Sequence, residues 1–587
     1  MKLLLCALNA KYIHSNLAVY SLMAYAKGAP MELKLAEYTI NNRTEEILKE
    51  IYREKADIVA FSCYIWNIEQ VYELVRELHK VAPHISIWLG GPEVSYDAGK
   101  VLREHPEVAL VMMGEGEETF RQLTESWGTG MELSTVDGIA YRQGEEIHCN
   151  AMRPQMDMDK IPFVYEDLDQ FKNKIIYYET SRGCPFSCSY CLSSIDKRVR
   201  FRSFSLVQKE LKHFLDHDVK QVKFVDRTFN CNHKHAMEIW EYITKHDNGI
   251  TNFHFEVSAD LLKDEDIQLF EGMRPGLIQL EIGVQSTYQP TIGEIRRTMD
   301  LEALKKLVAR VKALGNIHQH LDLIAGLPLE DYGTFKKSFD EVFSMQPDQL
   351  QLGFLKVLKG SYMHEKSKDY EIAYRSRAPY EVLKTKWLSY DEILKLKEVE
   401  EMVELYYNSA QYTKTLPYLL TFAKGPYAFF RELATFYYQR NRIGVKHSRL
   451  SYYELLREFA LFAYPEVEEG VLDQLLMYDL YLRENIKKRP QWGNTQVLEK
   501  KAATRFYRME GVEKYFPQMQ PYDSKLAAGN SHVERFFIDV DTYEKKDWWA
   551  LFDYHTRNPL TYDATVREVK GIEDGSGKSI GNLQDTE

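Results

Sequence analysis

The stretch Ser181-Arg182-Gly183-Cys184-Pro185-Phe186-Ser187-Cys188-Ser189-Tyr190-Cys191 decides how the rest of the chain is interpreted. It places three cysteines within eight residues, with the spacing Cys-x3-Cys-x2-Cys, directly after the apolar, strand-like run Ile175-Ile176-Tyr177-Tyr178. Thiolates are the soft ligands that iron–sulfur clusters use, and a cubane [4Fe-4S] cluster takes four ligands. Three ligands from this loop would leave one iron open for a small molecule.

A zinc site, a disulfide framework and chance clustering are the alternatives for these cysteines. Zinc sites join Cys-x2-4-Cys pairs or add histidines to reach four closed ligands, and no such partner pair follows Cys191. A disulfide framework is disfavoured because the chain has only seven cysteines in 587 residues and starts without a secretory signal. Chance clustering of buried cysteines is the third alternative.

The spacing, with the aromatic Tyr190 just before the third cysteine, resembles the radical S-adenosylmethionine (SAM) superfamily. The resemblance implies that Cys184, Cys188 and Cys191 hold a [4Fe-4S] cluster, beside Tyr190, and that the amino and carboxylate groups of SAM chelate the open iron. It also implies a low-potential electron donor such as flavodoxin or ferredoxin. An electron from the cluster would then cleave SAM to methionine and a 5′-deoxyadenosyl radical.

The composition is that of a soluble protein with about three domains. Hydrophobic residues make up 44% of the chain. The sequence contains no run of about 18 apolar residues, so no membrane span is predicted. The net charge of −12 argues against a large nucleic-acid footprint, which would favour a basic face, although a local basic patch stays open. A thiolate-held cluster predicts a cytoplasmic, oxygen-sensitive protein.

Residues 1–150 alternate between apolar, strand-like segments and helix-like segments. We expect strands at 2–8, 33–38, 57–62, 85–89 and 110–113, helices at 16–27, 44–55 and 68–81, and a hairpin at 137–147. Such alternation predicts a parallel, doubly wound, Rossmann-like sheet that binds ligands at the carboxyl ends of its strands. The candidate binding residues at those ends are Ser62, Tyr64, Trp66, Asn67, Gly90, Gly91, Glu93, Gly114 and Glu115.

The ligand of this domain is not a nicotinamide, because the first strand is not followed by Gly-x-Gly-x-x-Gly. The segments at 61–67, 90–93 (Gly-Gly-Pro-Glu) and 114–117 (Gly-Glu-Gly-Glu) instead resemble the cobalamin-binding domain that precedes many radical SAM cores. Glycines there let the backbone approach a corrin. A flavodoxin-like module that binds nothing is the alternative.

The lower axial ligand of the corrin is where the chain departs from the family pattern. Many cobalamin domains carry Asp-x-His-x-x-Gly after the first strand, whereas residues 9–16 read Asn-Ala-Lys-Tyr-Ile-His-Ser-Asn. His14 is out of frame, so a capping or surface histidine is favoured. We expect cobalamin with no histidine below it.

Residues 170–365 carry six strand candidates separated by helical stretches, which suits the partial (β/α)6, TIM-type barrel of the radical SAM superfamily. The candidates are 175–179, 219–225, 252–257, 277–284, 317–324 and 349–358. The cysteines follow the first strand, at the mouth where the loops of such barrels form the reactive face.

Polar residues and a glycine near the ends of these strands are the candidate SAM contacts. By the resemblance, Asp226 lies where the SAM amino group is held, Glu281 could accept both ribose hydroxyls, and Gly326 would place backbone beside adenine. Glu256 and Ser258 end the third strand and complete the set. For each carboxylate the alternative is a structural ion pair at the barrel mouth, for instance with an arginine.

The remaining chain is mostly α-helical by pattern from 366 to 570, with one strand expected at 535–540. The tail at 571–587 is rich in Gly, Ser and Asp and is expected to be disordered. The C-terminal region resembles a family-specific domain of unknown role on one group of cobalamin radical SAM proteins.

These features together predict a cobalamin-dependent radical SAM enzyme that methylates an unactivated carbon of a small-molecule or peptide substrate. In this subclass one SAM methylates cobalamin and a second gives the radical that removes a substrate hydrogen. Radical rearrangement, cyclisation or reduction without methyl transfer is the alternative chemistry. RNA modification and a non-catalytic, cobalamin-responsive module are further alternatives, and the three intact cysteines weigh against the last.

Overall fold

The computed structural model describes residues 1–127, 132–570 and 572. The described part of the chain forms two compact units, of which the first combines Met1–Tyr332 with Gly353–Tyr390. The second combines Gly333–Leu352 with the described residues from Asp391 onward. Except for Ile572, the tail expected to be disordered lies outside the described residues.

The N-terminal sheet of the first unit has the strand order β2-β1-β3-β4-β5-β6-β7, with β1 to β5 parallel and the hairpin β6–β7 antiparallel. The order places the first strand inside the sheet, as the predicted doubly wound topology requires. The strands are β1 (Lys2–Asn9), β2 (Glu32–Thr39), β3 (Ile58–Ser62), β4 (Ser86–Gly90), β5 (Val108–Met112), β6 (Ile139–Gln143) and β7 (Glu146–Cys149).

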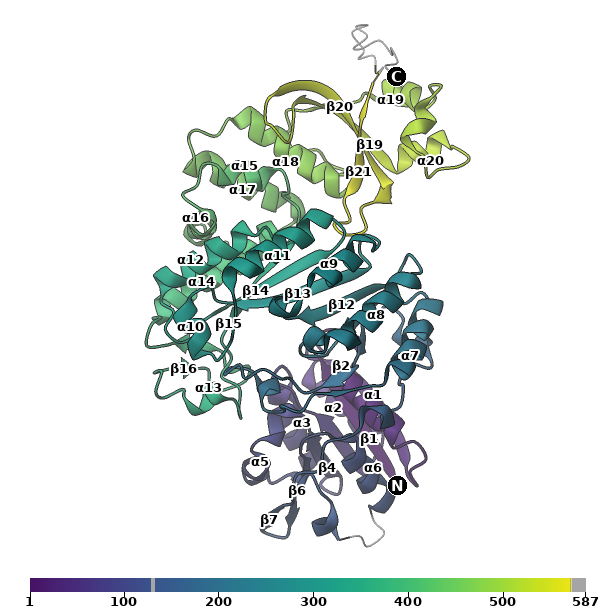
Figure 1. Ribbon diagram of the computed structural model, residues 1–587, viewed down its shortest axis with the longest axis vertical. Helices are drawn as coiled ribbons and strands as arrows, with labels where there is room; N and C mark the ends of the chain where they lie inside the picture. Colours follow the sequence, from purple (N-terminus) through teal and green to yellow (C-terminus); the bar gives the residue numbers. More distant parts are fainter. Residues whose placement is uncertain (128–131, 571, 573–587) are drawn as a thin grey trace. The chain divides into compact units, whose positions relative to one another are not determined.

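Helices cover both faces of this sheet, because successive residues of the buried strands point to opposite sides (Figure 1). Leu4, Cys6 and Leu8 of β1 pack in the core with α2 (Thr44–Arg53), α3 (Ile68–Val81) and α5 (Ala98–Glu104). The intervening Leu3, Leu5 and Ala7 pack with α1 (Leu17–Tyr25) and α6 (Glu117–Ser126). The near-continuous apolar runs of the sequence are thus explained by burial on both faces.

The second sheet is the predicted barrel sheet, in the order β8-β11-β12-β13-β14-β15, and its strands β8 to β14 belong to the first unit. The pairs from β8 to β14 are parallel. Helices α7 (Phe204–Asp216), α8 (His233–Lys245), α9 (Asp264–Glu271) and α11 (Leu301–Leu314) pack side by side against the sheet (Figure 1). The strands are β8 (Ile176–Tyr178), β11 (Gln221–Phe224), β12 (Asn252–Val257), β13 (Ile278–Gln285), β14 (His318–Ala325) and β15 (Gln349–Phe354).

The second unit begins as the helical region that the sequence predicts. It contains α14 (Tyr390–Val403), α15 (Thr415–Leu420), α16 (Pro426–Gln439), α17 (Arg449–Ala463) and α18 (Glu469–Arg483). Helix α18 is buried along most of its length, including Asp479. That carboxylate accepts hydrogen bonds from the backbone N–H groups of Lys414 and Thr415 and from the Thr415 hydroxyl, so it fixes the start of α15.

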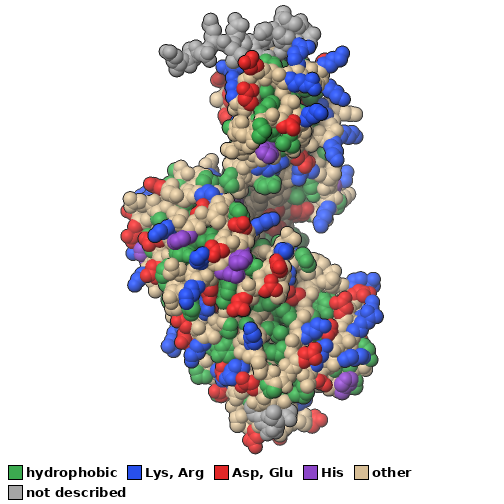
Figure 2. Space-filling view, turned by 90° about the vertical axis from the view of Figure 1, so that its right-hand side faces the viewer, with side chains coloured by type: hydrophobic (Ala, Val, Ile, Leu, Met, Phe, Trp, Pro, Cys, Tyr) green, Lys and Arg blue, Asp and Glu red, His purple; other side chains and the backbone are tan. Residues whose placement is uncertain are grey.

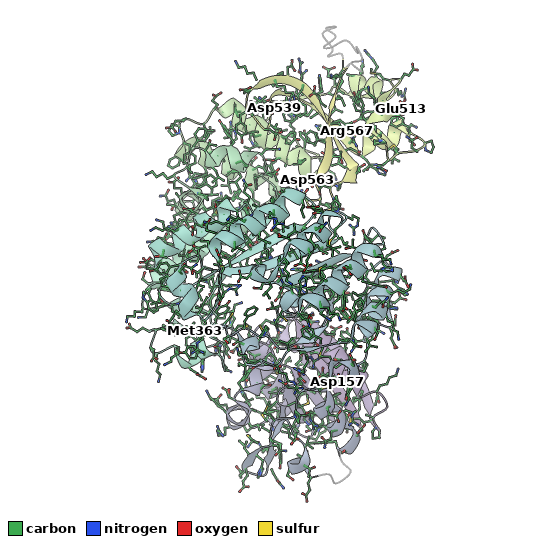
Figure 3. The ribbon with its side chains drawn as sticks, in the orientation of Figure 1. Asp157, Met363, Glu513, Asp539, Asp563 and Arg567 are labelled. Carbon is green, nitrogen blue, oxygen red and sulfur yellow. The ribbon has the colours of Figure 1, made fainter. Side chains whose placement is uncertain are left out.

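An antiparallel sheet follows the helices, with the order β18-β19-β20-β21. The predicted strand at 535–540 is found as β19 (Ser531–Ile538), whereas β18 (Gln496–Val497), β20 (Lys545–Arg557) and β21 (Ala564–Val569) were not anticipated. Asp563, which directly precedes β21, forms an ion pair with Arg483 at 2.8 Å (Figure 3). Arg567, within β21, forms an ion pair with Asp553 at 3.3 Å. The C-terminal region is therefore mostly helical, as expected, with a sheet at its end.

The surface carries both signs of charge. Figure 2 shows acidic and basic side chains mixed across one face of the molecule. Among the described residues, no helix combines the length and the apolar character that a bilayer span requires.

Candidate functional site

The cysteine loop is closed at its base by a short antiparallel pair, β9 (Ser181–Arg182) with β10 (Arg200–Phe201). Within it, the Cys184 N–H donates to the Asp196 carbonyl at 2.9 Å. Gly183 has a φ of +95°, and a Cβ there would lie 2.6 Å from the Arg198 carbonyl oxygen, so only glycine fits. The loop that carries the three cysteines therefore requires glycine at its first turn.

All three cysteines are free thiols in this loop: Cys184 is buried, and Cys188 and Cys191 are partly exposed. The half-buried Arg297 lies beside Cys188 and Tyr190 and donates to the Gly283 carbonyl. Burial raises the pKa of Cys188, and the Arg297 guanidinium opposes this. Among the described residues the Arg297 Nε–H has no hydrogen-bond acceptor. A half-buried cation with a spare donor beside free thiols fits an anionic, thiolate-bound cluster.

Asp226 holds the start of this loop. Its buried carboxylate accepts hydrogen bonds from the Thr180 N–H, the Thr180 hydroxyl and the Ser181 hydroxyl, at 3.0, 2.7 and 2.6 Å. Burial raises the pKa of Asp226. These donors occupy both carboxylate oxygens, so the geometry assigns Asp226 a positioning role; its contact with the SAM amino group stays a prediction.

A cavity of about 1020 Å³ opens beside the carboxyl ends of β3, β4 and β5. It also reaches the barrel, because Glu179, Arg182, Val225 and Arg227 line it. Tyr64 and Trp66 stack in its wall with ring centroids 4.3 Å apart. The predicted cobalamin contacts that line this cavity are Ser62, Tyr64, Trp66, Gly90, Gly91, Gly114 and Glu115.

Two predicted cobalamin contacts have other partners. Asn67 is buried, accepts from the Tyr64 N–H and donates to the carbonyls of Leu8 and Ser62, so it shapes the loop after β3. Glu93 is buried as well: the Tyr380 hydroxyl donates to it, and Lys359 Nζ lies 2.9 Å from it. Both positions support the cavity wall from behind.

His14 also lines the cavity, and its Nδ1 lies 2.6 Å from the Tyr177 hydroxyl. This contact is made across the two sheets, because Tyr177 belongs to β8. Burial lowers the pKa of His14. That cobalamin binds here with no histidine below it stays a prediction.

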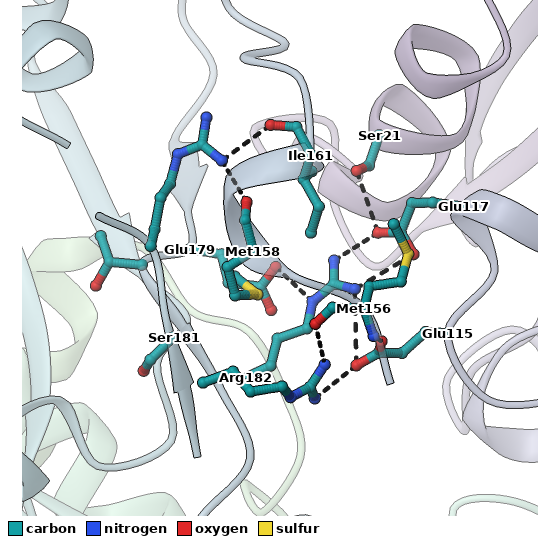
Figure 4. A network of polar contacts seen from close by, with 12 residues as sticks. Ser21, Glu115, Glu117, Met156, Met158, Ile161, Glu179, Ser181 and Arg182 are labelled. Carbon is teal, nitrogen blue, oxygen red and sulfur yellow. Dashed lines mark hydrogen bonds and ion pairs between the residues drawn. The ribbon is translucent and has the colours of Figure 1, made fainter. Parts of the chain in front are cut away.

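A polar network connects the Gly-Glu-Gly-Glu segment after β5 to the cysteine loop (Figure 4). The Arg182 guanidinium donates to the Glu117 carboxylate at 2.5 and 3.2 Å and to Glu179 at 2.9 Å. Arg200 lies 2.6 Å from Glu115. Burial would raise the pKa of Glu117, but Arg182 outweighs it and holds that pKa below its ordinary value. The two glutamates therefore fix the cysteine loop against the N-terminal sheet.

The predicted SAM carboxylates Glu256 and Glu281 are register partners on β12 and β13. Burial, with the Glu281 charge nearby, raises the pKa of Glu256 to about 7. Burial would also raise the pKa of Glu281, but contacts with His254 and Lys223 lower it to about 2. Near neutral pH, Glu256 is therefore partly protonated, whereas Glu281 stays ionised.

The last two predicted SAM contacts lie at the ends of β12 and β14. Ser258 exchanges backbone hydrogen bonds with the Asn230 side chain, both at 2.9 Å. Gly326 has a φ of +93°, and a Cβ there would lie 2.9 Å from Val382 Cγ1. Close packing therefore requires glycine at 326, whichever ligand approaches its other side.

Comparisons with known proteins place these features in families. The B12 binding domain model matches residues 4–124, the radical SAM superfamily model matches 178–342, and the model of a protein of unknown function, DUF4080, matches 368–552. The chain therefore carries a B12-binding domain, a radical SAM domain and a C-terminal DUF4080 domain. This domain set confirms the resemblance, the fold class and the cofactors predicted from the sequence.

Known proteins are similar in sequence to parts of the chain. An uncharacterized methyltransferase of Pyrococcus horikoshii is 31% identical over 205 residues, which are 33% of this chain and 44% of the relative. The cobalamin-dependent radical SAM methyltransferase TokK of Streptomyces tokunonensis is 27% identical over 300 residues, 48% of this chain and 44% of TokK. The chain spans less than half of the length of these relatives.

A solved structure shares the fold. OxsB, a cobalamin-dependent SAM radical enzyme solved with aqua-cobalamin bound, superposes with a TM-score of 0.57 over 82% of this chain and 83% of OxsB. The identity is 16%, so the likeness concerns the fold.

Several residues of the site were missed from the sequence. Arg182 and Glu117 each stand within a recognised motif, yet nothing in the motif shows that they pair. Lys359 and Tyr380 lie far along the chain from Glu93. His320 and Asp322 carried a usable signal: they are polar residues at alternate positions of the apolar strand β14, which indicates that they share one face.

Proposed function

We propose that this protein is a cobalamin-dependent radical SAM methyltransferase that transfers a methyl group to an unactivated carbon of a small-molecule or peptide substrate. One observation carries the proposal: a single cavity is lined both by the strand ends of the B12-binding domain and by residues next to the cysteine loop. Methyl transfer between two cofactors needs them to share one enclosed space.

The residues present fit the cofactors. The cavity volume of about 1020 Å³ is at the upper end of the roughly 300–1,000 Å³ of small-molecule sites. The stacked Tyr64 and Trp66 rings offer a flat apolar wall, which suits the face of a macrocycle. Cys184, Cys188 and Cys191 provide thiol ligands beside the half-buried Arg297.

When bound, the [4Fe-4S] cluster, SAM and cobalamin supply the electron transfer, radical formation and methyl transfer. The residues of this chain supply position. Asp226 holds Thr180 and Ser181 at the root of the cysteine loop, and Arg182 fixes that loop to Glu117. Electrons would come from a low-potential donor such as flavodoxin or ferredoxin, in the cytoplasm.

The first experiment counts products. Anaerobically reconstituted protein is incubated with hydroxocobalamin, SAM and a low-potential reductant, and 5′-deoxyadenosine and S-adenosylhomocysteine are measured by mass spectrometry. We expect both products from the wild type and loss of 5′-deoxyadenosine in the variant Cys184→Ala/Cys188→Ala/Cys191→Ala. Cys231→Ala, which removes a thiol outside the motif, is the matched control and should cleave SAM.

The outcome also separates methyl transfer from its alternative. 5′-Deoxyadenosine without S-adenosylhomocysteine would favour radical rearrangement, cyclisation or reduction. Protein that retains cobalamin and a competent cluster, yet cleaves no SAM, would contradict the enzyme proposal.

A further inference from the structure

A cluster of titratable side chains lies inside the barrel, apart from the cysteine loop. The four strands β11 to β14 contribute to it: Lys223 from β11, His254 from β12, Glu281 from β13, and His320 with Asp322 from β14. The register of the sheet pairs Lys223 with His254, Glu281 with His320, and Asp322 with Gly283. Because His254 pairs with Gln279, these pairs follow one another in two-residue steps, which keeps their side chains on one face of the sheet.

The cluster has the ligand atoms of a metal site. One ligand atom each from Glu281, His320 and Asp322 lies within 4.8 Å of the others. His254 Nε2 lies 2.9 Å from Glu281 Oε2 and adds a fourth donor. Imidazole nitrogen with carboxylate oxygen is the donor set that suits divalent Zn, Fe and Mn.

The second observation is that these atoms approach one another without bonding. His254 and His320 are 7% and 6% exposed, and His320 Nε2 lies 3.1 Å from Asp322 Oδ1. Nevertheless, neither Nε2 atom nor Asp322 Oδ1 has a hydrogen-bond partner of acceptable geometry among the described residues. Buried polar atoms are normally satisfied, so these three need another partner.

The geometry is the one expected around a shared cation. Ligand atoms of one metal ion lie close together, but their lone pairs point at the metal and not at each other. A hydrogen-bonded pair behaves differently, as His233 and Asp266 show: their atoms are 3.0 Å apart and do form a hydrogen bond. Distance alone therefore does not explain the missing bonds in the barrel.

We propose that Glu281, His320 and Asp322, with His254 as a fourth donor, bind one divalent transition-metal cation inside the barrel. No cysteine is among these donors, so the ion would be distinct from the iron–sulfur cluster. Lys223 Nζ lies 3.0 Å from Glu281 Oε2. A carboxylate has two oxygens, so Lys223 can orient one while the other binds the metal, as outer-shell partners do.

This inference goes beyond the proposed function and does not depend on it. It gives Glu281 a partner other than the ribose hydroxyls predicted from the sequence. The methyl-transfer proposal is argued from the cavity and the cysteine loop, and it assigns no role to His254, His320 or Asp322. Failure of the metal site would consequently leave SAM cleavage untouched, and failure of SAM cleavage would leave the metal site untouched.

The test measures Zn²⁺ binding to the full chain by equilibrium dialysis and elemental analysis. The variant Cys184→Ala/Cys188→Ala/Cys191→Ala provides a background in which the motif thiols cannot bind metal. On it, His320→Gln and Asp322→Asn remove proposed ligands at nearly constant volume. His233→Gln, which removes a buried-carboxylate partner outside the cluster, is the matched control.

We expect one equivalent of Zn²⁺ to bind to the background variant and to the His233→Gln control. Binding should weaken by about 100-fold or more in His320→Gln and in Asp322→Asn, at least the loss seen when even outer-shell partners are removed. Absence of stoichiometric Zn²⁺ from the background variant would overturn the proposal and leave the cluster as a site for a polar substrate. Unchanged binding in both ligand variants would overturn it too.

A second measurement needs no ligand variant, in case these fail to fold. Zn K-edge X-ray absorption of the Zn²⁺-loaded background variant should show only nitrogen and oxygen ligands at about 2.0–2.2 Å, including imidazole. Sulfur in the shell, from a remaining cysteine, or a shell without imidazole would contradict the assignment.

Discussion

Two polar clusters of the first unit have opposite hydrogen-bonding states. Around Arg182, each carboxylate meets a guanidinium, and Glu117 is 4% exposed but paired at 2.5 Å. Around Glu281, Lys223 donates to the carboxylate, but His254 Nε2, His320 Nε2 and Asp322 Oδ1 are left unbonded among the described residues, although the nitrogens lie 2.9 and 3.1 Å from carboxylate oxygens. A network whose polar atoms are all hydrogen-bonded holds parts of a fold together, whereas buried polar atoms without hydrogen bonds imply a ligand. Similar side chains therefore stabilise the fold around Arg182 and are proposed to bind a ligand around Glu281.

The largest effect should come from breaking the satisfied cluster. Arg182→Met removes the cation between Glu117 and Glu179 and leaves a buried carboxylate without its charge partner. We expect a loss of about 3–5 kcal/mol in the free energy of unfolding, because an uncompensated buried charge is costly. Urea unfolding followed by tryptophan fluorescence measures it. A change below about 1 kcal/mol would mean that water reaches Glu117.

A buried carboxylate without any cation provides the intermediate case. Burial raises the pKa of Asp479 to about 6, although hydrogen bonds from Thr413, Lys414 and Thr415 oppose this. An unfolded aspartate titrates near about 3.9. The folded state thus holds its proton more tightly, so this contribution to stability is full below about pH 4 and is lost as the pH rises to about 6.

Asp479→Asn isolates that contribution, because the amide does not titrate. The difference in unfolding free energy between wild type and variant should fall by about 3 kcal/mol, as an order of magnitude, between pH 4 and pH 7. Denaturant unfolding of both proteins across this range measures the difference. A difference that does not change with pH would show that Asp479 titrates normally.

For the cluster around Glu281, the unfolding free energy should depend on added metal more than on substitution of a single side chain. Without metal, His320→Gln should change the unfolding free energy by at most about 1 kcal/mol, because among the described residues His320 Nε2 has no hydrogen bond to lose. On the Cys184→Ala/Cys188→Ala/Cys191→Ala background, Zn²⁺ at about 100 times its dissociation constant should add about 2.7 kcal/mol, and it should add nothing once His320→Gln is introduced. Thermal unfolding with and without Zn²⁺ checks this; equal gains would contradict the site.

An exposed ion-pair group on α6 should show the smallest loss of unfolding free energy. Arg121 contacts Glu118 and Glu125 on α6, and these side chains are 27–44% exposed. Arg121→Ala should cost no more than about 1 kcal/mol, since solvent screens exposed ion pairs. The measurement is the urea unfolding used for Arg182→Met, and a cost comparable with that variant would show that burial is not what distinguishes the two arginines.

The C-terminal unit shows where pattern fails. Strand β20 begins Lys545-Lys546-Asp547-Trp548-Trp549, and a run that opens with three charged residues does not predict a strand. The structure satisfies these charges across the sheet: Arg535 on β19 pairs with Asp547, and Lys546 lies 3.2 Å from Glu568 on β21. The strand exists because of cross-strand pairs, which a single segment does not reveal.

The sequence by itself determined whatever depends on local spacing. Apolar runs and helical periodicity located the strands and helices of both α/β domains, and the short spacing of Cys184, Cys188 and Cys191 predicts a cluster-binding loop. The glycine-rich strand ends located most of the cavity wall for the same reason.

Tertiary structure alone decided which distant side chains meet. Arg182 finds Glu117, 65 residues away, and Glu93 finds Tyr380, 287 residues away. Glu281, His320 and Asp322 converge because Glu281 pairs with His320 across β13 and β14, and Asp322 follows two residues later on the same face of β14. Register follows from the packing of whole sheets, so pairing, pKa shifts and the proposed metal site could not be predicted from local pattern.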